Sequence, residues 1–200
     1  MASQPYLLYL HGFLSSPDSA KAQQALAYCR SRGLELDIPL INQAPAQAMK
    51  MLHRRLGEGL ARHGEAALIG SSLGGYYATS LAQAYGLRAV LINPAVKPYL
   101  LLQDYLGEQR NVHSGEVQLV TTAQIEELRS IEVTELRQPE NFLLMLQTGD
   151  ETLDYRQAAE KYAQAELFIE PGGDHSFQGF DRQLPRILDF LLSRNEAKAR

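Results

Sequence analysis

Short apolar runs alternate with longer helical patterns over the first 92 residues, and no other feature limits the possible folds as strongly. The apolar runs have the length of buried strands and lie at Tyr6–Leu10, Leu34–Pro39, Ala66–Gly70 and Arg88–Ile92. The helical patterns between them cover residues 16–33, 44–64 and 73–85. Strands that alternate with helices of this length form a parallel sheet with helices on both faces.

The alternation stops after Pro94 and returns near Asn141. Between them lie an apolar stretch, YLLLQDYLG, a polar piece, and one helical pattern, TTAQIEELRSI. The chain then continues as strand, helix, strand and helix at residues 141–148, 153–162, 165–170 and 182–194. We therefore expect one α/β domain over residues 1–200. Residues 95–140 form a lid-like insertion over the carboxyl edge of its sheet, where open α/β sheets bind ligands.

Composition and charge argue against several classes of protein. A hydrophobic content of 45% and a charged content of 21% are typical of soluble globular chains, and a net charge of −4 gives no basic surface for nucleic acid. Cys29 is the only cysteine, which excludes intrachain disulfides and cysteine metal clusters. No run approaches the roughly 18 apolar residues of a membrane span, and no basic leader is present. We expect a cytoplasmic protein.

A glycine-rich turn, GSSLG at residues 70–74, follows the third strand and precedes the third helix. It fits G-x-S-x-G with Ser72 at the centre, in the strand–turn–helix setting of a nucleophile elbow. Glycines suit this turn because its sharp bend leaves no room for neighbouring Cβ atoms. The turn would place Ser72 Oγ at a helix start, where the Leu73 amide can donate to an oxyanion. A plain glycine-rich turn is the alternative.

A serine hydroxyl needs a base to act as a nucleophile near neutral pH. The candidates are His11, His53, His63, His113 and His175. Two lie on the second helical pattern, one lies in the polar part of the insertion, and His11 is expected to anchor a loop after the first strand. His175, in EPGGDHSFQGF, follows the last strand, so its loop reaches the same sheet edge as Ser72. His175 is therefore the predicted base, with a capping or solvated loop histidine as the alternative.

The base needs a carboxylate to fix its tautomer and to stabilise the imidazolium. Asp150, in LQTGDETLDY, lies at the end of the strand before the histidine strand. Glu151 and Asp154 are the next candidates, with Asp154 expected in the following helix. Asp174 adjoins His175 in sequence, and a side chain rarely reaches its neighbour's ring nitrogen squarely. The alternative role for Asp150 is a helix N-cap.

The order Ser72, Asp150, His175 is the chain order of α/β-hydrolases. A loop of sequence HGF follows the first strand, and the Phe13 amide there can donate to the same oxyanion as the Leu73 amide. Each of these motifs lies at the end of a predicted strand. Together they predict a serine hydrolase with the three-layer α/β-hydrolase fold, whose chemistry requires no metal or organic cofactor.

Five segments together resemble the YqiA-type bacterial esterases, which are grouped with the YcfP-like small α/β-hydrolases. The segments are YLHGFLSSPDSAKAQ, GSSLGGYYAT, INPAVKPY, QTGDETLDYRQA and GGDHSFQGFDR, and the resemblance runs to about Leu192. It implies the α/β-hydrolase fold and esterase activity, including activity on acyl-CoA thioesters. It also implies Ser72 as nucleophile, Asp150 as triad acid and His175 as base.

The function expected first is hydrolysis of carboxylic esters, and of acyl-CoA thioesters as the resemblance implies, through an acyl-serine intermediate. The partner is then a small acyl ester or acyl-CoA. Two alternatives stay open: acyl transfer on the same fold, and a non-catalytic interaction protein that kept the fold. Residues 95–140 are expected to set the acyl preference, with YLLL and IEELRSI supplying an apolar wall.

Overall fold

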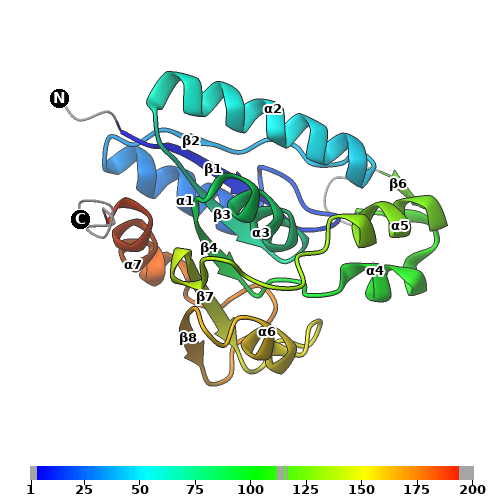
Figure 1. Ribbon diagram of the computed structural model, residues 1–200. Helices are drawn as coiled ribbons and strands as arrows, with labels where there is room; N and C mark the ends of the chain where they lie inside the picture. The colour runs from blue at the N-terminus through cyan, green and yellow to red at the C-terminus, as the bar shows by residue number, and fades with distance from the viewer. Residues whose placement is uncertain (1–3, 112–114, 116, 194–200) are drawn as a thin grey trace.

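The computed structural model describes residues 4–111, 115 and 117–193 (Figure 1). His113, one of the candidate bases, lies outside these residues. Six strands form one sheet in the order β2-β1-β3-β4-β7-β8, and every neighbouring pair is parallel. The strands are β1 (Tyr6–Leu10), β2 (Leu36–Asp37), β3 (Ala66–Ser71), β4 (Arg88–Ile92), β7 (Phe142–Gln147) and β8 (Glu166–Glu170).

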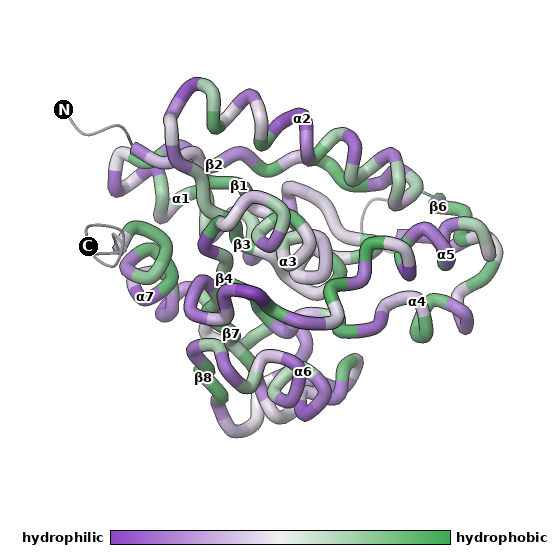
Figure 2. The backbone as a smooth tube through the Cα atoms, in the orientation of Figure 1, coloured by the Kyte–Doolittle hydropathy of each residue, from purple (hydrophilic) through white to green (hydrophobic). Residues whose placement is uncertain are grey.

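Helices cover both faces of this sheet. On one face lie α1 (Ala20–Ser31) and α7 (Phe180–Leu192), and on the other lie α2 (Pro45–His63), α3 (Leu73–Tyr85) and α6 (Tyr155–Lys161). Alternate strand residues enter two cores, so that Leu7 packs with the first group of helices and Leu8 with the second. Hydrophobic and hydrophilic residues alternate along α2 in Figure 2, as expected of a helix with one buried face. The predicted three-layer arrangement is confirmed.

Local sequence explains where the two central helices begin and end. Pro45 occupies the first turn of α2, where its missing N–H costs no hydrogen bond. Gly64 ends α2 and Gly86 ends α3, both in the left-handed conformation that glycine adopts without a steric penalty. The predicted bounds of α3 match those in the structure.

The second strand is shorter than the run over residues 34–39 predicted. Only Leu36 and Asp37 pair with β1, at the edge of the sheet. Pro39 has no N–H to donate to a ladder, so the strand cannot continue through it. The apolar character of the run instead reflects burial, since Leu34 is 8% exposed and packs in the core beside α1.

Residues 95–140 carry more regular structure than the sequence indicated. They contain α4 (Pro98–Leu101), η1 (Leu102–Tyr105), an antiparallel hairpin of β5 (Gly107–Arg110) and β6 (Val117–Val120), α5 (Thr122–Ser130) and most of η2 (Pro139–Asn141). The helix α5 was predicted and the hairpin was not, because GEQR lacks the β-branched and aromatic residues typical of strands. We call residues 98–130 the cap. In Figure 1 the cap lies to the right, beyond the carboxyl ends of the strands.

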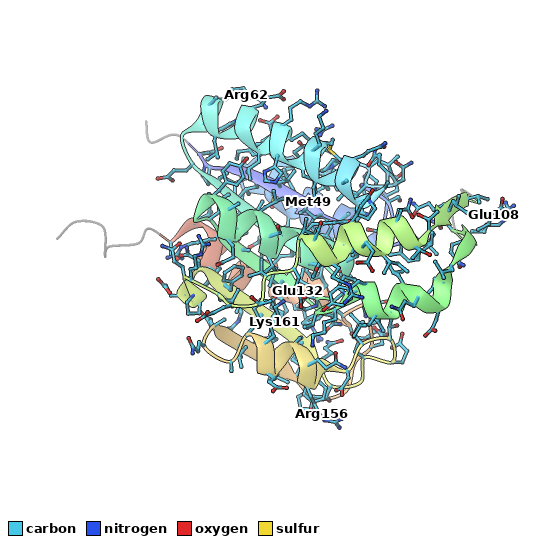
Figure 3. The ribbon with its side chains drawn as sticks, turned by 45° about the vertical axis from the view of Figure 1, so that its right-hand side comes forward. Met49, Arg62, Glu108, Glu132, Arg156 and Lys161 are labelled. Atoms are coloured by element: carbon cyan, nitrogen blue, oxygen red, sulfur yellow. The ribbon has the colours of Figure 1, made fainter. Side chains whose placement is uncertain are left out.

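Hydrogen bonds fasten the cap to the helices beneath it. Tyr76 Oη on α3 donates to the Leu128 carbonyl at 2.8 Å, and the Glu127 carboxylate accepts from the backbone N–H of residue 46 at 3.0 Å. Beyond α5, Glu132 lies beside Lys161 of α6, and Glu108 on β5 lies at the outer edge of the cap (Figure 3). The cap is therefore attached on two sides. None of the helices described here is long and apolar enough to cross a membrane.

Candidate active site

Ser72 occupies the sharp turn between β3 and α3. Its backbone has φ 55° and ψ −121°, a conformation that is strained for any residue with a side chain. A Cβ on Gly74 would lie 2.0 Å from the Leu10 carbonyl oxygen, and one on Gly70 would lie 2.5 Å from the Gly74 carbonyl oxygen. Both positions therefore require glycine. The Ser72 amide donates to the Ile92 carbonyl at 3.1 Å, which ties the turn to β4.

The structure brings Ser72, Asp150 and His175 together, although they lie far apart in the sequence. His175 Nε2 lies 3.1 Å from Ser72 Oγ. His175 Nδ1 lies 2.8 Å from Asp150 Oδ2 and 3.0 Å from Oδ1. A carboxylate only accepts hydrogen bonds, so Nδ1 carries the proton and Nε2 is free to accept from the serine hydroxyl. This is the geometry that a serine nucleophile and its base require.

The surroundings of Asp150 favour its ionised form. Its side chain is only 2% exposed, and burial by itself would raise the pKa of the carboxyl. The hydrogen bond from His175 and those from the amides of Leu153, at 2.8 Å, and Thr152, at 2.9 Å, outweigh burial. The net result is a pKa below the usual value, so Asp150 carries its charge at neutral pH.

The other predicted acids have different partners. Asp154 is the N-cap of α6 and accepts from the Arg156 amide at 3.1 Å, so the capping role considered for Asp150 belongs to Asp154. Glu151 accepts from the backbone N–H of His175 at 3.0 Å and thus supports the loop rather than the ring. Among the residues described, no group of three His, Cys, Asp or Glu side chains is placed to hold a metal ion.

His11 fixes the loop that carries the Phe13 amide. Its ring is 2% exposed, and burial lowers its pKa, so the ring is neutral. Nδ1 donates to the Gly12 carbonyl at 2.9 Å, and Nε2 accepts from the Ile41 amide at 2.9 Å. In a trans peptide the C=O and N–H point in opposite directions, so the bond to Gly12 also sets the direction of the Phe13 N–H. A Cβ on Gly12 would lie 3.1 Å from Ser72 Cβ, which places this loop beside the serine.

Two buried amides, Asn93 and Gln147, hold the His175 loop, and sequence analysis missed them both. Asn93 Nδ2 donates to the carbonyls of Asp174 at 3.1 Å and His175 at 3.3 Å, while its Oδ1 accepts from the Gln147 amide at 3.1 Å. Gln147 Oε1 accepts from the amides of Asp174 at 3.1 Å and Gln178 at 2.8 Å. We call this pair the amide brace. Its signal in the sequence is a polar residue closing each of two apolar strands.

A lysine also reaches the same loop. Lys21 Nζ, from α1, donates to the Ser176 carbonyl at 2.9 Å. Burial lowers the pKa of Lys21, and the charges of Asp174 and Asp150 oppose that shift. The Asp150 carboxylate therefore has Lys21 near it as well as hydrogen-bond donors. In sequence Lys21 looks like an ordinary residue in the first turn of a helix, so only the tertiary structure reveals this contact.

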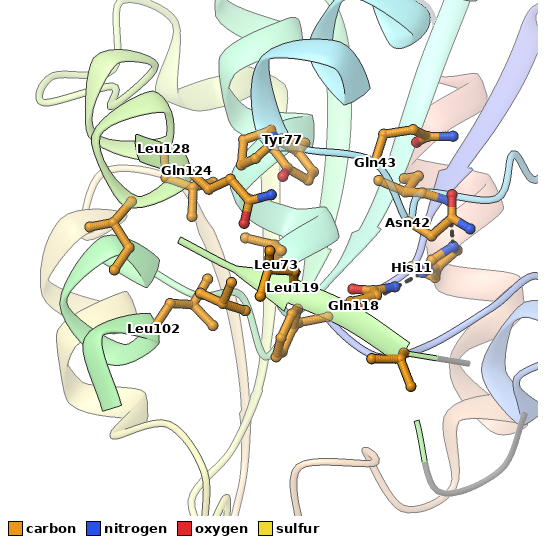
Figure 4. A pocket seen from close by; sticks show the side chains of 17 residues that line it. His11, Asn42, Gln43, Leu73, Tyr77, Leu102, Gln118, Leu119, Gln124 and Leu128 are labelled. Atoms are coloured by element: carbon orange, nitrogen blue, oxygen red, sulfur yellow. Dashed lines mark hydrogen bonds between the residues drawn. The ribbon is translucent and has the colours of Figure 1, made fainter. Parts of the chain in front are cut away.

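A cavity of about 220 Å³ opens beside the serine turn (Figure 4). It is lined by both residues whose amides were predicted to bind an oxyanion, Phe13 and Leu73. The cap supplies an apolar part of its wall through residues that include Leu102, from the predicted YLLL stretch, and Leu128. Leu101 is 42% exposed and lies outside this lining. The cavity thus extends from the predicted oxyanion site to the underside of the cap.

Comparison with known proteins gives both a family and a fold. The family model described as "Uncharacterised protein family (UPF0227)" matches residues 6–192. A UPF0227 protein of Shewanella woodyi is 25% identical over 193 residues, which cover 92% of this chain and 98% of that protein.

Two solved structures share the architecture. Est1E from Butyrivibrio proteoclasticus has a TM-score of 0.71 at 12% identity and covers 96% of this chain and 88% of its own. Alpha/beta hydrolase domain-containing protein 10 from mouse has a TM-score of 0.70 at 18% identity and covers 96% and 91%. The parallel sheet with helices on both faces is therefore the α/β-hydrolase fold.

Proposed function

The chain belongs to the UPF0227 family, which is the YqiA and YcfP esterase family, and from this premise we propose that it is a serine hydrolase of carboxylic esters and acyl-CoA thioesters. One observation carries the proposal. Ser72 Oγ, in a strained turn, lies 3.1 Å from a histidine nitrogen whose partner nitrogen is held by a buried carboxylate. No simpler role accounts for a strained serine, a fixed tautomer and a buried charge at one point.

The reaction proceeds in two halves. In the first, His175 Nε2 takes the proton of Ser72 as Oγ attacks the acyl carbonyl, and the amides of Phe13 and Leu73 stabilise the oxyanion that forms. The tetrahedral intermediate collapses and breaks the bond to the alcohol or thiol, which leaves with the proton from His175. In the second half, water attacks the acyl-serine ester and gives a proton to His175. The bond between the acyl carbon and Ser72 Oγ then breaks, His175 returns the proton to Oγ, and the carboxylic acid departs. Asp150 stays ionised throughout and stabilises the imidazolium.

Turnover of a small ester panel tests this function. The purified protein should hydrolyse p-nitrophenyl butyrate and butyryl-CoA, with release of the free acid. If an added alcohol captures most of the acyl group at the expense of water, the protein is an acyltransferase. If neither compound is consumed and no serine reacts with a fluorophosphonate, the protein is a non-catalytic member of the fold.

We propose that the cap is a partial lid that sets the acyl preference. Its contact with the site supports this role, because the Tyr105 ring meets the Phe13 ring edge-on at 6.2 Å and Asn111 Nδ2 donates to the Leu14 carbonyl at 2.7 Å. Both contacts join the cap to the loop that carries the Phe13 amide. A cavity of about 220 Å³ corresponds to roughly seven water-sized volumes. It therefore suits acyl groups of about that many heavy atoms.

The chain-length profile should follow from that size. Each buried CH₂ contributes about 0.8 kcal/mol, or about fourfold in kcat/KM. We expect kcat/KM for p-nitrophenyl esters to rise from acetate to about hexanoate and then to fall. Leu102→Trp should move the optimum to shorter chains, because residue 102 lines the cavity. The neighbouring Leu101→Trp should leave the profile unchanged, because residue 101 is exposed. A flat profile that neither substitution alters would show that the cap does not select the acyl group.

The amide brace should affect catalysis without touching the substrate. Asn93→Asp keeps the size of the side chain and its tolerance of a positive φ, here 40°, but turns the donor toward the Asp174 and His175 carbonyls into an acceptor. The His175 loop should shift, and a displacement of about 1 Å lowers kcat on the order of 10²-fold. KM should change little.

Asn141→Asp is a matched control for this substitution. Asn141 is also buried, at 5% exposure, but lies at the opposite end of β7 and donates to Gln138. Its substitution should lower the melting temperature and leave kcat near the wild-type value. If the two variants had equal kcat values, the amide brace would not position the His175 loop for catalysis.

A further inference from the structure

The cavity beside Ser72 contains a tyrosine hydroxyl that has no hydrogen-bond partner among the residues that the structure describes. Tyr77 lines the cavity and is only 2% exposed, and no hydrogen bond of its hydroxyl to another described residue is present. Other buried tyrosines are satisfied: Tyr76 donates to the Leu128 carbonyl at 2.8 Å, and the Tyr162 hydroxyl lies 2.7 Å from Thr79 Oγ1. The Tyr77 hydroxyl oxygen is not enclosed by protein atoms but borders the cavity, so its hydrogen bond is left to whatever occupies the cavity. A ligand in the cavity is the missing partner that fits its position.

A carboxamide from the cap faces the same space. Gln124 Oε1 accepts from the Thr121 amide at 3.1 Å in the capping box of α5. Its NH₂ group has no protein acceptor among the described residues. Figure 4 shows Gln124 and Tyr77 directed toward the same region of the cavity, near Leu128. A hydroxyl and an amide NH₂ there can both donate to one oxygen atom of a ligand.

The rest of the lining limits what that ligand can be. None of the residues that line the cavity is Asp, Glu, Lys or Arg. A charged group inside would therefore lose its hydration without gaining a counter-charge, which is strongly unfavourable. Apolar side chains such as Leu73 and Leu102 make up much of the remaining wall. The cavity thus suits a neutral, mostly aliphatic group that carries an oxygen.

The position of Tyr77 sets where that oxygen lies along an acyl chain. Tyr77 follows Leu73 by four residues on α3, so the two share a helix face and are about 6 Å apart along the axis. The carbonyl of a bound ester lies at the Leu73 amide in the proposed mechanism. An oxygen that reaches Tyr77 is therefore several bonds down the chain from that carbonyl.

We propose that this cavity is an acyl subsite selective for short, neutral acyl groups that carry a keto or hydroxyl oxygen several carbons from the ester carbonyl. Tyr77 and Gln124 are its specificity-determining residues. The assignment rests on the proposed hydrolase function and narrows its substrates to a chemical class. A plain alkanoyl group of the same size enters the cavity but leaves both donors without a partner, and a site built to hydrogen-bond a substrate rejects such an analogue.

Two esters of nearly equal shape test the assignment. In p-nitrophenyl 5-oxohexanoate a ketone oxygen occupies the place of a methyl group in p-nitrophenyl 5-methylhexanoate. The wild-type protein should favour the oxo ester in kcat/KM by about tenfold or more. Tyr77→Phe should reduce that ratio to about one or below. Gln124→Glu, which keeps the acceptor of the capping box and loses the donor, should do the same.

Melting temperatures and a second tyrosine variant distinguish a failure of the subsite proposal from a failure of the hydrolase proposal. Tyr77→Phe breaks no hydrogen bond between described residues, so its melting temperature should equal or exceed that of the wild type. Tyr76→Phe, on the same helix, breaks the bond to Leu128 and should lower the melting temperature without changing the ratio. A wild-type preference for the methyl ester, or a ratio that Tyr77→Phe leaves unchanged, overturns the subsite while leaving the hydrolase in place. Failure to hydrolyse either ester overturns the hydrolase and the subsite together.

Discussion

Replacing Ser72 with alanine is expected to lower kcat for ester hydrolysis on the order of 10⁴–10⁶-fold, since removing the nucleophile of such a triad removes the covalent route. The loss should appear in kcat rather than in KM, because Oγ acts on the reacting carbon and contributes little to binding of the ground state. The fold should survive. Among the described residues, Ser72 Oγ forms a hydrogen bond only with His175. The alanine variant keeps the backbone hydrogen bonds that hold the turn in place. Steady-state kinetics with p-nitrophenyl butyrate would measure the loss.

Ser71→Ala is the control for that experiment, because it removes the neighbouring hydroxyl. Ser71 is 4% exposed and its side chain interacts with the hydroxyl of Tyr9 inside the core. Removing it leaves the Tyr9 hydroxyl buried without that partner, at a cost of about 1–3 kcal/mol in the free energy of unfolding. We expect a lower melting temperature and nearly full activity. A dead Ser71→Ala and an active Ser72→Ala would mean that the nucleophile is wrongly assigned.

Replacing Asp150 with asparagine is expected to cost on the order of 10⁴-fold in kcat, by analogy with serine proteases. Asparagine has nearly the same shape, but its NH₂ can face His175 Nδ1 and favour the tautomer with the proton on Nε2. That nitrogen then cannot take the proton of Ser72. The buried site would also lose the negative charge that stabilises the imidazolium. The measurement is again kcat, together with a circular dichroism spectrum to show that the variant is folded.

Asp154→Asn is the matched control for the acid. Asp154 caps α6 through the Arg156 amide, and asparagine caps helices about as well as aspartate. Its activity and stability should stay close to those of the wild type. If the two substitutions had the opposite effects, Asp154 would be the acid, and the distances of 2.8 and 3.0 Å between His175 and Asp150 would have no catalytic meaning.

Much of the fold could be predicted because short apolar runs and helical patterns are local signals. The run over Tyr6–Leu10 and the helix over Leu73–Tyr85 have the predicted bounds. The apolar run over residues 34–39 was a poorer guide at the edge of the sheet. There only the two residues of β2 pair with β1, and both precede Pro39. The hairpin of the cap escaped prediction because its first strand is polar. Its pairing depends on a partner strand across the loop rather than on its own composition.

The candidate site, like the fold, has one part that could be predicted from the sequence and one part that could not. Ser72, Asp150 and His175 each lie just after a predicted strand, and parallel strands bring their carboxyl ends to one edge, so their approach could be predicted. The amide brace and the cavity wall could not. Asn93 reaches the His175 loop 82 positions further along the chain, and no local pattern encodes that contact. Tyr77 has the apolar spacing of a core residue, and only the tertiary structure shows its hydroxyl in a cavity.

The central claim is that Ser72 is a nucleophile activated by His175, and covalent labelling tests it most directly. The folded protein should react with one equivalent of a fluorophosphonate, with loss of ester hydrolysis in proportion to labelling. Tandem mass spectrometry of the peptide that spans the GSSLG turn should place the adduct on Ser72 and not on Ser71. Ser72→Ala should remain unlabelled. An adduct on Ser71 or on any other residue, or a folded wild-type protein that takes up no label, would contradict the account.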